Sequence, residues 1–228
     1  MQLLLTTLKK AKKLEETFTE EEWLEKTFES ETSETIMMNR IGVLALQGGV
    51  EEHIHALLNA SKKLGTPIVV VEVRTVEDLE GLDGLVIPGG ESTAISKLME
   101  REGMFEQIKK IRKIMGTCAG AVMLAKNVDG AIAGQKFLSL MDIDVSRNAY
   151  GTQLASFEDM LTTVFGRLPG VFIRAPRLTF TSKQIQVLAF HKEEPVGVYQ
   201  PIGNQHFVAF TFHPELTNTK FHEFFLKL

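Results

Sequence analysis

A cysteine between two glycines is the residue of this chain best suited to chemistry. Cys118 stands in the run GTCAG, residues 116–120. The apolar stretch before it is typical of a strand and the stretch after it of a helix. Small residues two positions away on either side permit the sharp turn that places a nucleophile at a strand-to-helix junction. There the helix dipole favours a thiolate, and the N–H of Ala119 points to where an oxyanion would form. The run predicts a nucleophilic thiol.

A histidine and a glutamate two residues apart offer that thiol a base. His213, Pro214 and Glu215 follow an apolar run, residues 207–212, that predicts a strand. Residues two apart in an extended segment point to the same side. We therefore expect Glu215 to accept a hydrogen bond from one ring nitrogen of His213, which leaves the other nitrogen free to face Cys118. This arrangement is a catalytic triad with cysteine in place of serine.

A third run, PGGES at residues 88–92, also follows an apolar strand pattern. Glycines let the backbone approach a ligand closely. We expect the N–H of Gly90 to be a second oxyanion donor and the carboxylate of Glu91 to bind a substrate amine. Taken alone, the run also fits an ordinary loop with a serine helix cap, and a lone cysteine is more often a small buried apolar residue. The three runs together favour catalysis.

From Ile41 onward, strand patterns and helix patterns alternate along the chain. This alternation predicts a doubly wound, mostly parallel α/β sheet with helices on both faces. The later part is richer in short strands and ends in a helix with Phe221 and Phe225 on one face. The predicted strands are 41–46, 68–73, 85–87, 112–117, 140–145, 171–173, 185–190 and 207–212, and the predicted helices are one ending at residue 64, then 92–102, 104–110 and 119–126.

The charge distribution separates an N-terminal extension from one domain. Residues 1–36 hold five Lys and nine Glu, so they carry the whole net charge of −4, whereas residues 37–228 hold 20 basic and 20 acidic side chains. We expect an extension over 1–38, with two short amphipathic helices, and a domain over 39–228. The lysines follow the apolar residues 3–5, which is the reverse of a secretory signal. The extension is either a docking arm or an appendage, and Met37 and Met38 are candidate natural starts.

Composition excludes several classes of protein. The chain is 44% hydrophobic and 24% charged with one cysteine, which argues against disorder, a disulfide framework and a Cys-rich metal site. No apolar run is long enough to span a bilayer, and the negative net charge argues against nucleic-acid binding. His53 and His55 lie two apart on a predicted helix and make a poor metal pair. We expect a cytoplasmic protein without metal, cofactor, membrane or nucleic acid.

The motifs in their order resemble a known family. GTCAG, HPE and PGGES resemble the class I glutamine amidotransferases. Four further stretches resemble the glutaminase subunits of pyridoxal 5'-phosphate synthases, and the resemblance covers about residues 41–228. These stretches are LALQGGV at 44–50 with Glu52-His53, RNAYG at 147–151, GVFIRAP at 170–176 and FHPEL at 212–216.

The resemblance implies a flavodoxin-like open sheet and a glutaminase that needs no cofactor. Cys118 would attack the side-chain amide of L-glutamine, with His213 and Glu215 completing the triad. It also implies that a separate synthase subunit receives the ammonia, in a large hetero-oligomer in which the glutaminase is nearly idle until that subunit binds. The implied glutamine-binding residues are Gly90, Glu91, Ser92, Arg147, Ile173 and Arg174, and the implied oxyanion residues are Gly90, Ala119 and Gln47.

Three alternatives stay open at this stage. One is an amidotransferase that serves a different acceptor, another a related cysteine hydrolase, and the third a binding module that keeps the fold without catalysis. Release of ammonia from glutamine separates the hydrolase from the amidotransferases, and an intact triad argues against the binding module.

Overall fold

The computed structural model describes residues 38–147 and 156–228. The predicted extension over 1–38 therefore lies outside the described residues except for Met38. The same holds for residues 148–151 of the RNAYG motif, of which only Arg147 is described.

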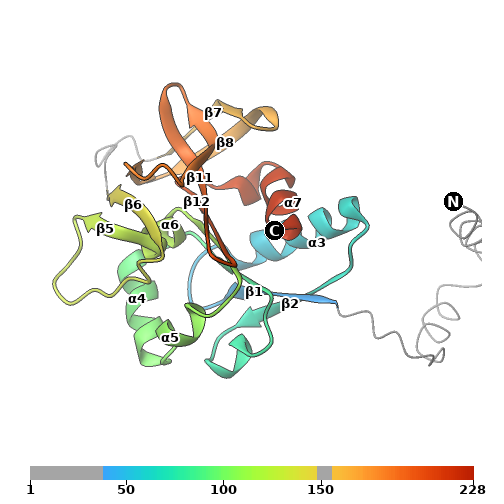
Figure 1. The fold of residues 1–228 in the computed structure, drawn as a ribbon, viewed down its shortest axis with the longest axis vertical. Helices are drawn as coiled ribbons and strands as arrows, with labels where there is room; N and C mark the ends of the chain where they lie inside the picture. Colours follow the sequence, from blue (N-terminus) through green and yellow to red (C-terminus); the bar gives the residue numbers. More distant parts are fainter. Residues whose placement is uncertain (1–37, 148–155) are drawn as a thin grey trace, which may run out of the picture. The chain divides into compact units, whose positions relative to one another are not determined.

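Nine strands of the described chain form one sheet, in the order β2-β1-β3-β4-β12-β11-β10-β7-β8 (Figure 1). The strands are β1 (Asn39–Leu44), β2 (Ile68–Val73), β3 (Gly84–Ile87), β4 (Lys113–Thr117), β7 (Ser156–Thr163), β8 (Gly166–Ile173), β10 (Gln186–His191), β11 (Glu194–Ile202) and β12 (Gln205–Phe210). The predicted strands of the main sheet are therefore present, with ends that shift by a few residues.

The sheet has a parallel half and an antiparallel half. The strands β2, β1, β3, β4 and β12 are parallel neighbours, whereas β12, β11, β10, β7 and β8 pair antiparallel. The prediction of a mostly parallel sheet holds for the first half only. It missed the antiparallel half because short connections, such as the turn between β11 and β12, return the chain beside itself as hairpins.

Helices cover both faces of the parallel half (Figure 1). On β3, Leu85 and Ile87 join one buried cluster and Val86 joins the other, as the alternation of side chains along a strand requires. One cluster includes Ile95 of α4 and Ile108 of α5, and the other includes residues of α3 and α7, which lie side by side. The helices are α3 (Val50–Leu64), α4 (Ser92–Arg101), α5 (Phe105–Ile108), α6 (Ala119–Leu124) and α7 (Lys220–Lys227), with the 3-10 turns η1 (Glu77–Leu79) and η2 (Pro214–Leu216).

A second, three-stranded sheet follows α6 directly. It consists of β5 (Ala125–Asp129), β6 (Met141–Ser146) and β9 (Arg177–Thr179), in that order. The predicted helix over 119–126 is therefore two residues too long, since the chain enters β5 at Ala125 and pairs there with β6. No helix of the described residues is long and apolar enough to cross a membrane.

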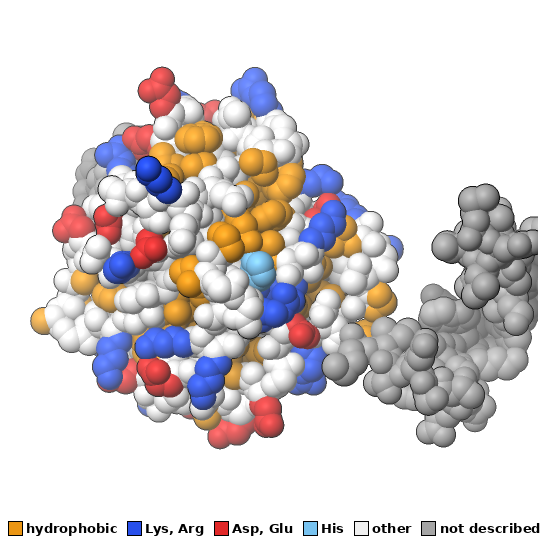
Figure 2. Space-filling model, in the orientation of Figure 1, with side chains coloured by type: hydrophobic (Ala, Val, Ile, Leu, Met, Phe, Trp, Pro, Cys, Tyr) orange, Lys and Arg blue, Asp and Glu red, His pale blue; other side chains and the backbone are white. Residues whose placement is uncertain are grey.

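The face drawn in Figure 2 carries basic and acidic side chains interspersed around hydrophobic ones. This mixture agrees with the equal numbers of basic and acidic residues in 37–228.

Candidate active site

The proposed nucleophile stands on a strained turn. Cys118 connects β4 to α6 with φ 48° and ψ −105°, a conformation that a residue with a side chain rarely adopts. The flanking glycines make this turn possible, because a Cβ on Gly120 would collide with the carbonyl of Ile87 and one on Gly116 with the carbonyl of Gly120. The GTCAG run therefore forms the sharp strand-to-helix turn expected of it, and strain of this kind is characteristic of functional sites.

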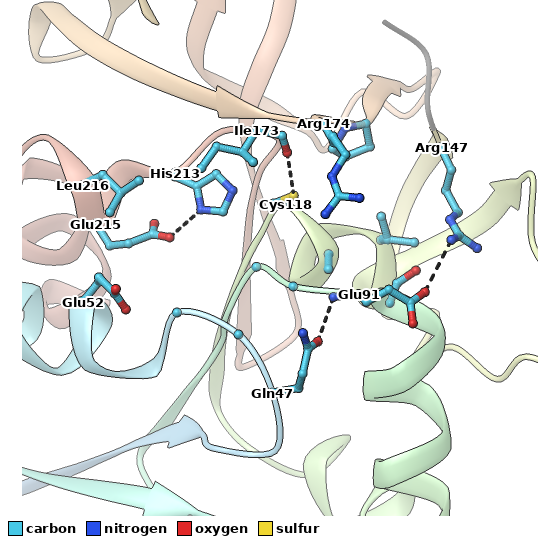
Figure 3. A pocket seen from close by; sticks show the side chains of 18 residues that line it. Gln47, Glu52, Glu91, Cys118, Arg147, Ile173, Arg174, His213, Glu215 and Leu216 are labelled. Atoms are coloured by element: carbon cyan, nitrogen blue, oxygen red, sulfur yellow. Dashed lines mark hydrogen bonds and ion pairs between the residues drawn. The ribbon is translucent and has the colours of Figure 1, made fainter. Parts of the chain in front are cut away.

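His213 and Glu215 form a tight buried pair beside this turn. Nδ1 of His213 lies 2.7 Å from Oε1 of Glu215, whose side chain is 1% exposed. The expected extended geometry is wrong, because Pro214–Leu216 form the 3-10 turn η2 and the two side chains meet across that turn. Figure 3 shows the imidazole between Glu215 and Cys118. A Cβ on Gly89 would touch both His213 and Cys118, so both side chains face the same glycine.

The surroundings of His213 favour its charged form. Burial alone would lower the pKa of this imidazole, but hydrogen bonds with Cys118 and Glu215, together with their charges, raise the pKa to about 10. The cationic ring is therefore stabilised between the sulfur and the carboxylate, which is the state that a proton taken from the thiol would create.

The end of β8 lies over the sulfur. Sγ of Cys118 donates a hydrogen bond to the carbonyl oxygen of Ile173 at 3.7 Å (Figure 3). The strand is held there because the N–H of His213 donates to the carbonyl of Val171 at 2.8 Å. The backbone of β8 thus joins the nucleophile and the base into one unit.

Hydrogen bonds fix the backbone segment that carries the predicted oxyanion donor Gly90. The N–H of Gly89 donates to Oγ1 of Thr117 at 3.1 Å, and the N–H of Glu91 donates to Oε1 of Gln47 at 2.8 Å. These bonds fix the segment that carries Gly90, where a Cβ would meet the Gln47 amide. Ala119 is the first residue of α6, so its N–H has no acceptor within the helix. Gly90 and Ala119 line the pocket, as does Gln47, so all three predicted oxyanion residues border it.

Charged groups occupy the far end of the pocket. Glu91, and not Ser92, caps α4, because its carboxylate accepts from the N–H groups of Thr93 and Ala94. Nη2 of Arg147 lies 3.8 Å from Oε1 of Glu91. Arg174 has φ 45° and makes no ion pair with the described residues. In Figure 3 its guanidinium points into the pocket.

These groups surround one cavity of about 380 Å³, within the range typical of small-molecule sites. The cavity contains every residue that the sequence predicted for the site. These are Gln47, Gly90, Glu91, Ser92, Cys118, Ala119, Arg147, Ile173, Arg174, His213 and Glu215. Within the described ranges, no group of three or more His, Cys, Asp or Glu residues could hold a metal ion.

The sequence analysis assigned no role in the site to two residues that lie next to it. Glu52 lines the pocket beside Glu215 (Figure 3), and His53 is fully buried behind it. The signal for His53 is its place on the buried stripe of α3, where it recurs at helical spacing with Ala56, Leu57 and Ala60. A histidine on such a stripe needs polar partners inside the protein.

In a comparison with known proteins, residues 43–228 match the model of the SNO glutamine amidotransferase family. A protein of Pyrococcus horikoshii named pyridoxal 5'-phosphate synthase subunit PdxT is 48% identical over 196 residues, which are 82% of this chain and 98% of that protein. Its namesake from Oenococcus oeni is 43% identical over 198 residues, 84% of this chain and 97% of the relative. A crystal structure titled glutamine amidotransferase superposes with a TM-score of 0.70 at 41% identity, covering 82% of this chain and 97% of that one.

Proposed function

This chain belongs to the SNO glutamine amidotransferase family, and from that premise we propose how it acts as the glutaminase subunit of a pyridoxal 5'-phosphate synthase. The enzyme hydrolyses L-glutamine to glutamate and ammonia. The observation that carries the proposed mechanism is the strained Cys118 beside the His213–Glu215 pair, over a pocket with two arginines.

In the proposed reaction, the proton of Cys118 resides on His213 in an imidazolium–thiolate pair, which the raised pKa of His213 favours, and the sulfur attacks the side-chain amide carbon of glutamine. The C–S bond forms as the carbonyl becomes an oxyanion, which the N–H groups of Gly90 and Ala119 stabilise. The imidazolium of His213 then gives its proton to the leaving nitrogen, and ammonia departs as the C–N bond breaks. Water, deprotonated by His213, hydrolyses the thioester to glutamate and restores the thiol. Glu215 keeps the imidazole aligned throughout.

The substrate's head group would bind at the far end of the pocket. A guanidinium suits the α-carboxylate through its planar pair of donors, and Arg174 makes no ion pair with the described residues that would compete for it. Glu91 would bind the α-ammonium group beside Arg147. Ser92 and Ile173 complete this part of the pocket, and Gln47 holds the segment around Gly90.

We infer that the partner is the synthase subunit, because the relatives are named as subunits of pyridoxal 5'-phosphate synthase, and that glutamine is the substrate, because the family is named a glutamine amidotransferase family. We propose that ammonia passes directly to the synthase in a large cytoplasmic hetero-oligomer. The proposal assigns this activity to one domain, residues 39–228. It also treats the parallel half as flavodoxin-like, because β2-β1-β3-β4-β12 follows the strand order 2-1-3-4-5 of that fold. The name shared by the relatives favours this synthase over another ammonia acceptor.

Substitution of the nucleophile tests the mechanism. We expect Cys118→Ala to lower glutamate formation, measured with the synthase subunit present, by about three orders of magnitude or more. Binding to the synthase should stay unchanged, because the substitution removes only a sulfur atom inside the pocket. Substantial residual turnover by this variant would exclude Cys118 as the nucleophile.

A further inference from the structure

A second pair of histidines lies behind the proposed triad. His53 of α3 and His222 of α7 are completely buried, and Nδ1 of His53 lies 3.0 Å from Nε2 of His222. Neither histidine is among the described residues that line the pocket. The reaction described above does not use them. Buried polar groups cost free energy unless they are satisfied, so this pair calls for a physical explanation.

The other ring nitrogen of His53 contacts two parts of the site. Nε2 lies 3.0 Å from Oγ1 of Thr117 and 3.5 Å from Oε2 of Glu215. This carboxylate oxygen is buried and accepts no hydrogen bond from the described residues. Thr117 precedes the nucleophile, and its hydroxyl also accepts the N–H of Gly89. One imidazole thus contacts the triad carboxylate and a residue that fixes the oxyanion segment.

Charge decides which nitrogen of His53 carries the proton. Burial lowers the pKa of both histidines, that of His222 to about 3, so both rings are neutral and each has one N–H. With the proton on Nδ1 of His53, a lone pair would face the unsatisfied oxygen of Glu215. With the proton on Nε2, an N–H faces both oxygens. Because an unsatisfied buried charge is costlier than an unsatisfied neutral acceptor, the Nε2–H form is favoured.

This choice also determines the state of His222. Nδ1 of His53 is then an acceptor, so His222 donates through Nε2. The ring atom left without a partner is Nδ1 of His222, which in this tautomer is a neutral acceptor and not a stranded N–H. The pair therefore leaves the less costly group unsatisfied.

We propose that His53 is a positioning residue of the glutaminase site. Its Nε2–H supports the second oxygen of Glu215 and the hydroxyl of Thr117, and this keeps the base and the oxyanion segment aligned with Cys118. His222 holds His53 in the required tautomer. The inference rests on the triad proposed above, because it assigns His53 an effect through Glu215 and no contact with the substrate.

Two amide substitutions distinguish the roles of the two ring nitrogens of His53. In His53→Gln the amide nitrogen takes about the place of Nε2, whereas in His53→Asn it takes about the place of Nδ1. We expect His53→Gln to keep kcat within about threefold of wild type. His53→Asn and His53→Leu should each lower kcat by about ten- to a hundredfold, as a small misplacement of catalytic groups does. KM for glutamine should change by less than about twofold, because His53 does not line the pocket.

The assay measures glutamate formation by the full chain with the synthase subunit. Thermal unfolding gives the folded fraction of each variant, and kcat is expressed per folded molecule. Equal kcat per folded molecule in all three variants would show a purely structural role and overturn the proposal. Rescue by Asn and not by Gln would overturn it too. If the variants do not fold, ¹⁵N NMR of wild-type His53 still decides, because protonation on Nδ1 contradicts the proposal. Undiminished turnover by Cys118→Ala would instead refute the proposed mechanism itself.

Discussion

Two histidines contact the same carboxylate from opposite sides and differ in charge, since His213 is cationic and His53 is neutral. On the pocket side, burial lowers the pKa of His213, but hydrogen bonds with Cys118 and Glu215, together with the charges of both groups, raise it to about 10. On the far side, burial keeps the pKa of His53 well below its usual value. The two rings differ in their partners, since His213 has Cys118 and lies 2.7 Å from one oxygen of Glu215, whereas His53 lies 3.5 Å from the other oxygen. Two close partners overcome the desolvation of His213, and one longer contact does not overcome that of His53.

This contrast assigns different work to the two sides of Glu215. A cationic ring beside Cys118 can donate a proton to a leaving group. A neutral ring behind the carboxylate can turn an N–H towards its second oxygen, which lies 3.5 Å away, without competing for its charge.

Removal of the negative charge of Glu215 should reduce turnover more than any other change considered below. We expect Glu215→Gln to lower kcat by about three to four orders of magnitude, because the imidazole loses its orientation and the partner of its positive charge. The pKa of His213, followed by NMR, should fall from about 10, since the variant lacks the carboxylate charge that opposes the effect of burial on this pKa. A pKa that stays near 10 in the variant would show that Glu215 does not cause the difference between the two histidines.

The pH dependence of the free energy of unfolding is a second test of the charge on His213. His213 binds its proton more tightly in the folded than in the unfolded chain, so its stabilising contribution is complete below pH 6.5 and is lost as the pH rises towards about 10. Glu215→Gln should flatten this alkaline loss in denaturant titrations. An unchanged slope would contradict the assignment.

A smaller effect is expected at Thr117, which joins the two sides. Thr117→Val keeps the shape of the side chain but removes the acceptor for the N–H of Gly89 and the contact with His53. A buried N–H without a partner should lower the free energy of unfolding by about 1–3 kcal/mol. Urea denaturation measures this loss. Wild-type stability in this variant would mean that the contacts of the Thr117 hydroxyl with Gly89 and His53 do not stabilise the fold.

The smallest effect concerns His222 and appears only in acid. Its folded pKa of about 3 lies below 6.5, so between these values the unfolded chain binds more protons. Stability is therefore complete above about pH 6.5 and falls as the pH drops. His222→Gln keeps a donor towards His53 but removes one titrating group, and the acid slope should decrease by up to about 1.4 kcal/mol per pH unit. An acid slope equal to that of wild type would show that His222 is not buried as a neutral ring.

The parts of the molecule that could be predicted from sequence depend on local signals. The glycines around Cys118 and the apolar runs of the parallel strands each occupy one short segment, and the structure has them close to the predicted positions. The pairing of His213 with Glu215 was also local, although the turn that joins them is a 3-10 turn and not an extended segment.

The parts that could not be predicted depend on distant contacts. The helix after Cys118 ends early because Ala125 pairs with Met141 on β6. The antiparallel half arises from strand pairings that no single segment specifies. His53 is the clearest case, since it meets His222 from 169 positions away and Thr117 from 64. Its neighbours in sequence give no sign of either contact.

The proposed mechanism requires that the sulfur of Cys118 become covalently bonded to the substrate. Acid quenching during turnover of glutamine with the synthase subunit, followed by mass spectrometry of the peptides, tests this directly. We expect a glutamyl group on Cys118 in the wild type and an increased amount where thioester hydrolysis is slowed. Continued glutamate formation with no adduct on Cys118 at any quench time would contradict the claim.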